Sequence, residues 1–146
     1  MKTHFYYLDS SALIKRYVKE LGSEKVEEIF STTPFCFTSV LTYAEIYATF
    51  YRLFRDSVIS KETLESLAYE FEMDWKKWTL VELRQEIRSL IPTILKNVSL
   101  KGADSVHLAT SLFLKEQGLS FVFLCSDKRL CNGARDFQLK VLDPAI

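Results

Sequence analysis

Four carboxylates of this chain stand beside apolar segments, at positions where a buried strand or helix has no structural need of a negative charge. Asp9 comes directly after an apolar run at 5–8, and Asp127 comes after a second run at 121–125. Glu45 and Asp104 each lie inside a short motif near the expected start of a helix. A site that gathered these four acids would suit a hard cation, because such cations prefer carboxylate oxygens. The expected chemistry is therefore metal-dependent phosphoryl transfer.

The elements that must position these acids alternate between strand and helix patterns. Apolar runs predict strands at 5–8, 35–38, 79–83, 121–125 and 140–142. Helical patterns occupy 10–18, 23–30, 41–55, 64–78, 87–95, 102–117 and 128–137. Ser10 or Ser11 can cap the first helix, Pro92 interrupts the fifth, and Gly118 can close the sixth. We expect one α/β domain over residues 1–146, with three α/β/α layers around a central, mostly parallel sheet of four to five strands.

In such a sheet, the four acids are expected at one edge. Asp9 and Asp127 fall just past the carboxyl ends of strands, and ligands of open parallel sheets bind in the crevice outside those ends. Glu45 lies near the start of a helix, on its polar stripe, and Asp104 lies in the first turn of another, where the helix dipole favours an ionised acid. Taken singly, Asp9 and Asp127 are equally typical of a cap or turn, whereas Glu45 alone favours a solvent-facing position and Asp104 alone a structural role in the first helical turn. Their shared placement favours a functional site.

Composition excludes some classes of protein and leaves others open. The chain has 146 residues, of which 48% are hydrophobic, so it is long and apolar enough to bury a core. Basic and acidic residues balance at 19 each, which counts against a high-affinity binder of duplex nucleic acid. Neither a GxGxxG pattern nor a P-loop is present among the four glycines. A receiver domain would need adjacent acids after the first strand, but Ser10 comes directly after Asp9.

The cysteines and the N-terminus predict where the protein works. Cys36, Cys125 and Cys131 form an odd set without CxxC spacing, as expected for reduced, buried thiols. The chain leads from Met1 straight into a strand pattern without the apolar region of a signal peptide. No apolar run approaches the length of a membrane span. We expect a cytoplasmic protein without a membrane association.

Four motifs of the chain resemble those of a known family. The segment Leu8-Asp9-Ser10-Ser11-Ala12-Leu13-Ile14-Lys15-Arg16-Tyr17 resembles the opening of PIN domains, and in particular of VapC-type toxin ribonucleases. Tyr43-Ala44-Glu45-Ile46 is similar to their second acidic motif. Ala103-Asp104-Ser105-Val106-His107-Leu108-Ala109 is similar to the third, and Ser126-Asp127-Lys128-Arg129-Leu130 to the fourth. The motifs span the whole chain in the family's order, and the first and third are quite specific.

The resemblance implies an activity, a cofactor and partners. It makes Asp9, Glu45, Asp104 and Asp127 the ligands of Mg²⁺ or Mn²⁺ in an endoribonuclease that cleaves single-stranded or loop RNA with metal-activated water. Ser10 and Ser126 are the expected supporting hydroxyls, and the position of His107 is mainly structural in the family. A cognate antitoxin and a homodimer are the implied protein partners. A PIN-like scaffold without nuclease activity and a nuclease outside any toxin–antitoxin pair remain open.

Physical reasoning adds further expectations for the same site. Without metal, four clustered carboxylates repel one another, which should raise the pKa of at least one. Metal binding should therefore stabilise the fold. Asp9 and Asp104 are the firmest candidate ligands, Asp127 is a third, and Glu45 is expected to act through water. Five basic residues are possible contacts for RNA phosphates, or else ordinary surface charges: Lys15, Arg16, Arg52, Lys128 and Arg129.

Overall fold

A computed structural model describes residues 4–146, and its centre is a sheet of five strands. The strands are β1 (Phe5–Leu8), β2 (Phe35–Ser39), β3 (Thr79–Val81), β4 (Val122–Leu124) and β5 (Val141–Leu142). Their order is β3-β2-β1-β4-β5, and all four neighbouring pairs are parallel. The chain therefore winds outward from β1 in both directions. Residues 1–3, which belong to the N-terminal stretch expected to contain no leader, lie outside the described range.

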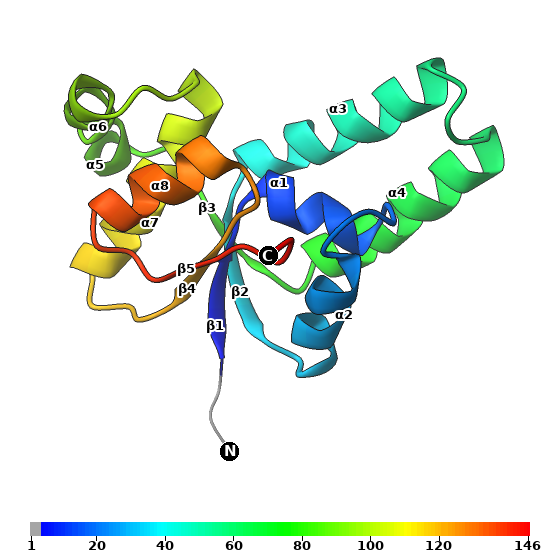
Figure 1. The fold of residues 1–146 in the computed structure, drawn as a ribbon, viewed down its shortest axis with the longest axis horizontal. Helices are drawn as coiled ribbons and strands as arrows, with labels where there is room; N and C mark the ends of the chain where they lie inside the picture. Colours follow the sequence, from blue (N-terminus) through cyan, green and yellow to red (C-terminus); the bar gives the residue numbers. More distant parts are fainter. Residues whose placement is uncertain (1–3) are drawn as a thin grey trace.

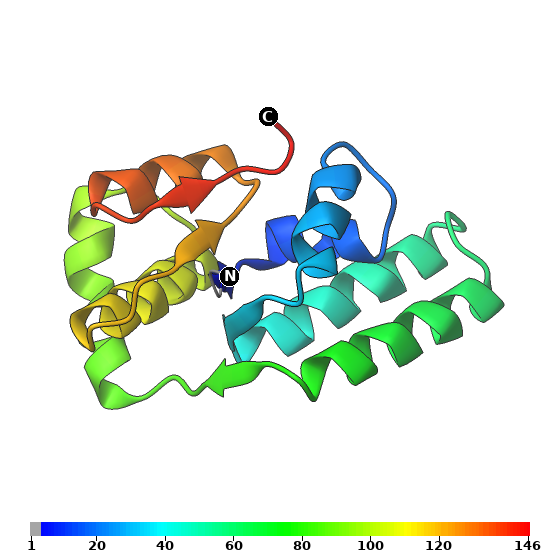
Figure 2. The same cartoon turned by 90° about the horizontal axis from the view of Figure 1, so that it is seen from below.

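Helices cover both faces of this sheet, as Figures 1 and 2 show. One face carries α1 (Ser10–Leu13), the 3₁₀ helix η1 (Ile14–Arg16), α2 (Ser23–Ser31), α3 (Leu41–Arg55) and α4 (Lys61–Trp75). The other face carries α5 (Gln85–Arg88), α6 (Ile91–Asn97), α7 (Gly102–Glu116) and α8 (Lys128–Asp136). The three α/β/α layers and the parallel sheet confirm the predicted fold class.

Strand alternation divides the core into two clusters, one on each face. Tyr7 and Phe123 point toward the α5–α8 layer, whereas Leu8 and Leu124 point toward the α1–α4 layer. This is the two-residue period of a strand that is buried on both faces, and it explains why the strand runs are apolar throughout. The central pair β1–β4 is thus held from both sides, and this packing also holds the residues at the carboxyl end of each strand.

The helix boundaries differ from the sequence expectation mainly at the start of the chain. Asp9, and neither Ser10 nor Ser11, is the N-cap of α1, and the helix gives way to η1 after Leu13. The α5–α6 region is two helices, with Pro92 in the first turn of the second, where its missing N–H has no partner to lose. Gly118 comes after α7 with a φ of 89°, as predicted for the residue that closes this helix. Within residues 4–146, no helix combines the length and the apolar character that crossing a membrane requires.

Candidate active site

Two of the four acids are brought together by the pairing of β1 with β4. Leu8 is in register with Leu124, and the Asp9 backbone N–H donates to the Leu124 carbonyl at 3.0 Å. The two strands therefore end at the same level. Asp9 is the first residue after β1, and Asp127 follows shortly after β4. The carboxyl edge of the sheet positions both acids, as the strand order requires.

The hydroxyl of Ser11 joins these two strand ends. It donates to Oδ2 of Asp9. The same carboxylate oxygen also accepts the Ser11 backbone N–H at 3.1 Å. In turn, the Ser11 Oγ accepts the backbone N–H groups of Ser126 at 2.9 Å and Asp127 at 3.1 Å. One side chain thus fixes the Asp9 carboxylate and the loop after β4 relative to each other.

The hydroxyls predicted for this supporting role, those of Ser10 and Ser126, do not make these contacts. Ser11 makes the contacts expected of Ser10, because the cap at Asp9 directs the second residue of α1 toward the loop after β4. Within residues 4–146, the Ser10 side chain makes no hydrogen bond. The Ser126 hydroxyl donates to Asp143 Oδ1 at 3.0 Å, so it supports the C-terminal segment and not one of the four acids. In the sequence, the cap motif Asp9-Ser10-Ser11 is the pattern from which the role of Ser11 could have been predicted.

Replacing Ser11 with alanine tests this assignment against its neighbour. The change leaves two backbone N–H groups without their acceptor and frees Asp9 Oδ2, so we expect RNA cleavage to fall about 10- to 100-fold, as for other partners that orient a ligand. Ser10→Ala is the matched control and should retain activity within about twofold, since Ser10 holds none of these groups. Initial cleavage rates at saturating Mg²⁺ measure both effects. Equal losses in the two variants would contradict the assignment.

His107 lies between Glu45 and Asp9 and contacts both carboxylates. The fully buried imidazole of α7 lies with Nε2 2.6 Å from Glu45 Oε1 and 3.6 Å from Asp9 Oδ1. Its Nδ1 is 2.8 Å from the Tyr7 hydroxyl. Burial lowers the pKa of His107, but the Glu45 hydrogen bond and the charges of nearby acids outweigh it and raise that pKa. The imidazole therefore lies between the two carboxylates and holds Glu45 near Asp9.

Asp104 shows that the four acids act on one another. Burial, then the charges of Asp9 and Asp127, raise the pKa of Asp104 to about 6, while His107 opposes this rise and Glu45 adds to it. The mutual repulsion predicted for clustered carboxylates thus contributes, together with burial, to the raised pKa of Asp104. Because α7 begins at Gly102, Asp104 lies in its first turn, near enough to Asp9 and Asp127 for their charges to raise its pKa.

The chemistry of these side chains fits a hard divalent cation bound mainly by water. Asp9 Oδ1 is buried and has no hydrogen-bond partner among the described residues, so it is a carboxylate oxygen free to bind a cation. Within residues 4–146, no three His, Cys, Asp or Glu side chains are close enough together to hold one ion by themselves. Mg²⁺ does not require this, because it keeps several waters and takes one or two carboxylates. The site resembles an outer frame of acids around a hydrated ion.

The predicted basic residues divide into two groups. Lys15 pairs with Glu20 at 3.0 Å, and Arg16 pairs with Asp74 at 2.7 Å, so both cations are engaged outside the acidic cluster. Each is held by an acid other than the four, so their contact with RNA phosphates stays a prediction. Arg52 is exposed and lines a groove of about 500 Å³ that also contains Glu45. Lys128 and Arg129 are exposed at the start of α8, directly after Asp127.

Comparison with known proteins places this geometry in context. A sequence profile of the PIN domain matches residues 6–136. Ribonuclease VapC45 of Mycobacterium tuberculosis (strain CDC 1551 / Oshkosh) is 29% identical over 142 residues, covering 94% of this chain and 97% of the relative. A toxin–antitoxin complex from Klebsiella pneumoniae superposes with a TM-score of 0.66 at 14% identity, over 97% of this chain and 98% of the other. FitAcB from Neisseria gonorrhoeae gives 0.69 at 13% identity, over 96% and 97%. At these identities, the two solved structures share the fold.

Proposed function

Because the chain belongs to the PIN domain family, we propose that it is a Mg²⁺- or Mn²⁺-dependent endoribonuclease that cleaves single-stranded or loop RNA. The observation that carries this proposal is the geometry at the carboxyl edge of the sheet, where Ser11 joins Asp9 to the Asp127 backbone and His107 lies 2.6 Å from Glu45 and 3.6 Å from Asp9. The ribonuclease names of curated relatives that span nearly the whole chain support the choice of RNA as substrate.

Each acid has a proposed role that agrees with its surroundings. Asp9 and Asp104 are the direct ligands, since Asp9 has a free buried oxygen and Asp104 is repelled by its neighbours until a cation is bound. Asp127 is the third proposed metal-binding acid and contacts the hydrated ion through water. Glu45 also acts through water, because His107 already holds one of its oxygens. When bound, the cation supplies an activated water and neutralises charge on the phosphate.

The remaining polar residues of the site orient the acids and the substrate. His107 keeps the Glu45 carboxylate turned toward Asp9, and Ser11 keeps Asp9 and the loop before Asp127 in place. Arg52, which lies further along α3 than Glu45 and lines the same groove, is the proposed contact for a flanking phosphate, together with Lys128 and Arg129. Phosphate contacts of this kind position an RNA strand without reading its sequence.

We further propose that this enzyme is the toxin of a toxin–antitoxin pair and works in the cytoplasm as a homodimer. Support comes from the structural relatives, which include toxin–antitoxin complexes, and from the curated VapC relatives. Aromatic side chains on α3 and α4, such as Tyr51 and Tyr69, are exposed and offer surface for an antitoxin or a second copy of the chain. Three free, buried cysteines agree with a reducing compartment.

Removal of divalent cations is expected to abolish the activity. Incubation of the purified protein with single-stranded RNA should yield discrete cleavage products in Mg²⁺ or Mn²⁺ and none in excess EDTA, because the four acids supply no nucleophile without a cation. The same ions should raise the melting temperature, since only the folded chain gathers the ligands. Cleavage that persists in EDTA would refute the metal dependence. A protein that binds partners but cleaves nothing in either metal would be a PIN-like scaffold.

A further inference from the structure

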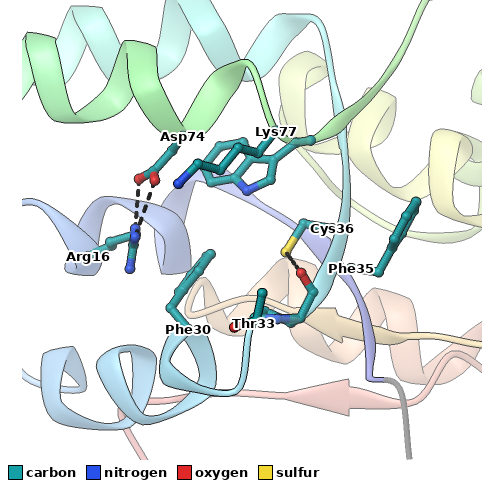
Figure 3. A pocket seen from close by; sticks show the side chains of 9 residues that line it. Arg16, Phe30, Thr33, Phe35, Cys36, Asp74 and Lys77 are labelled. Carbon is teal, nitrogen blue, oxygen red and sulfur yellow. Dashed lines mark hydrogen bonds and ion pairs between the residues drawn. The ribbon is translucent and has the colours of Figure 1, made fainter.

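A second pocket lies at the opposite edge of the sheet from the acids. It has a volume of about 390 Å³ and is formed where α2 ends, β2 begins and α4 passes into the segment before β3. Figure 3 shows the Arg16–Asp74 pair on one side, with Lys77 extending across from Phe30 and Thr33. Its size is within the range of small-molecule sites. The proposed metal site uses none of its residues.

The charge of this pocket is positive, because its one acid is already neutralised. Asp74 is buried and accepts hydrogen bonds from Arg16 Nε at 2.7 Å, Arg16 Nη2 at 3.2 Å and the Tyr17 hydroxyl at 2.6 Å. Within residues 4–146, the exposed Lys77 makes no ion pair and no side-chain hydrogen bond. An anionic ligand would thus find a free ammonium group, whereas a cation would find only a satisfied carboxylate.

Aromatic rings form the apolar part of the same pocket. The Arg16 guanidinium lies 4.2 Å from the centre of the Phe30 ring, and the Phe30 and Trp78 rings are 6.1 Å apart at 41°. Both rings are only partly buried, so each retains an accessible surface. Rings beside cations are the arrangement with which proteins bind unpaired nucleotides, because any base can stack on a ring while its phosphate meets a positive charge.

The backbone at the rim of the pocket is strained. Thr33 has a φ of 53°, in the left-handed region that a β-branched residue rarely adopts. Such a conformation persists only where its surroundings enforce it, and these positions concentrate at ligand sites. Thr33 belongs to the turn between α2 and β2, and it lies with Phe30 across the pocket from Lys77.

We propose that this pocket binds one nucleotide unit, with the base against Phe30 and Trp78 and the phosphate on Lys77 and the accessible part of Arg16. The unit comes either from a free nucleoside monophosphate or from a single RNA strand, and only the second source rests on the proposed function. In that case the pocket is an additional contact for the substrate, remote from the bond that is cleaved. The site discriminates against duplex nucleic acid, whose bases are not free to stack.

Binding is tested in EDTA, where no cleavage is expected. The probes are UMP, AMP and a short oligouridine with 2′-O-methyl groups, each titrated while the combined fluorescence of Trp75 and Trp78 is monitored. We expect saturable binding that weakens about tenfold or more in Lys77→Glu, because the phosphate loses a positive charge and meets a negative one. Lys76→Glu is the matched control, since Lys76 is an exposed neighbour that does not line the pocket. Phe30→Leu should weaken binding roughly fivefold or more through loss of stacking.

Each outcome of these titrations either supports the proposed nucleotide site or overturns it. Binding of the free nucleotides that is sensitive to Lys77→Glu supports the site and identifies a small-molecule source. Lys77-dependent binding of the oligouridine alone supports the site with an RNA strand as the source. Failure of all three probes to bind, or equal weakening by Lys76→Glu and Lys77→Glu, overturns the proposal. Because these titrations contain no divalent cation, a failure of the proposed nuclease activity would leave their result unchanged.

Discussion

Replacing Asp104 with asparagine is expected to lower RNA cleavage by about 10³-fold or more, since it removes a direct ligand of the cation that supplies the nucleophile. The amide keeps the size of the carboxylate but loses its charge and one acceptor oxygen. Asp9→Asn should have a similar effect, and asparagine at this position still serves as the N-cap of α1. Single-turnover cleavage of a labelled RNA in Mg²⁺ measures both losses.

The melting temperature of Asp104→Asn distinguishes the loss of a metal ligand from a folding defect. The pKa of Asp104 is raised to about 6 in the folded protein, above the ordinary 3.8, so the folded state binds this proton more tightly than the unfolded state. Ionisation of Asp104 therefore destabilises the metal-free protein as the pH rises from 3.8 to 6, and the penalty is complete above pH 6. At neutral pH, metal-free Asp104→Asn should melt at a higher temperature than the wild type, and at pH values below the ordinary pKa the difference should vanish.

The control for this substitution is an acid outside the site. Asp136→Asn changes an exposed residue in the last turn of α8 and should alter neither cleavage nor the pH dependence of melting. If Asp104→Asn retained wild-type cleavage, Asp104 would not be a ligand. If it lost cleavage but melted at a lower temperature above pH 6, a general structural defect would explain the loss.

Replacing Asp74 with alanine is expected to cause the largest loss of stability. Asp74 joins α4 to η1 by accepting from Arg16 and Tyr17, whose positions are 58 and 57 residues away in the chain. Its removal leaves the Arg16 guanidinium, half enclosed between Phe30 and α4, and the buried Tyr17 hydroxyl without their acceptor. Breaking a buried ion pair from one side costs about 3–5 kcal/mol, and the partial exposure of Arg16 reduces this to roughly 2–4 kcal/mol.

Urea denaturation of the variant and of a matched control measures this loss. Glu70 lies one turn before Asp74 on α4 and is exposed, so Glu70→Ala should change the free energy of unfolding by less than about 0.5 kcal/mol. Because η1 continues from the Asp9 segment, Asp74→Ala should also reduce cleavage at temperatures near its melting transition. A loss no larger than that of Glu70→Ala would mean that the Arg16–Asp74 pair contributes nothing to the fold.

The fold and the general location of the site can be predicted from short-range sequence patterns. Apolar runs predict a mostly parallel sheet of four to five strands, because the central strands β1 and β4 are packed on both faces. An acid shortly after β1 or β4 must then lie at the carboxyl edge. Gly118 and Pro92 mark helix limits through backbone geometry alone. The PIN-domain resemblance, carried by the motifs around the four acids, is confirmed by the match over residues 6–136.

The details that the sequence does not contain depend on distant contacts. Which of two adjacent serines reaches the loop after β4 is decided by where α1 begins, and that is set by the cap at Asp9. Arg16 resembles an RNA contact by position, but its partner Asp74 lies 58 residues away on another helix. His107 could be assigned to the site by its spacing from Asp104, yet its bond to Glu45 joins side chains of α7 and α3, two helices on opposite faces of the sheet.

The central claim is that Asp9, Glu45, Asp104 and Asp127 together bind a divalent cation, and a calorimetric titration with Mn²⁺ tests it most directly. We predict saturable binding to the wild-type protein and to Asp136→Asn, and affinity at least about tenfold weaker in Asp9→Asn and in Asp104→Asn, since each loses a charged ligand. Mn²⁺ binding of equal affinity in the wild type and in Asp104→Asn, or no binding to the folded wild-type protein, would contradict the account.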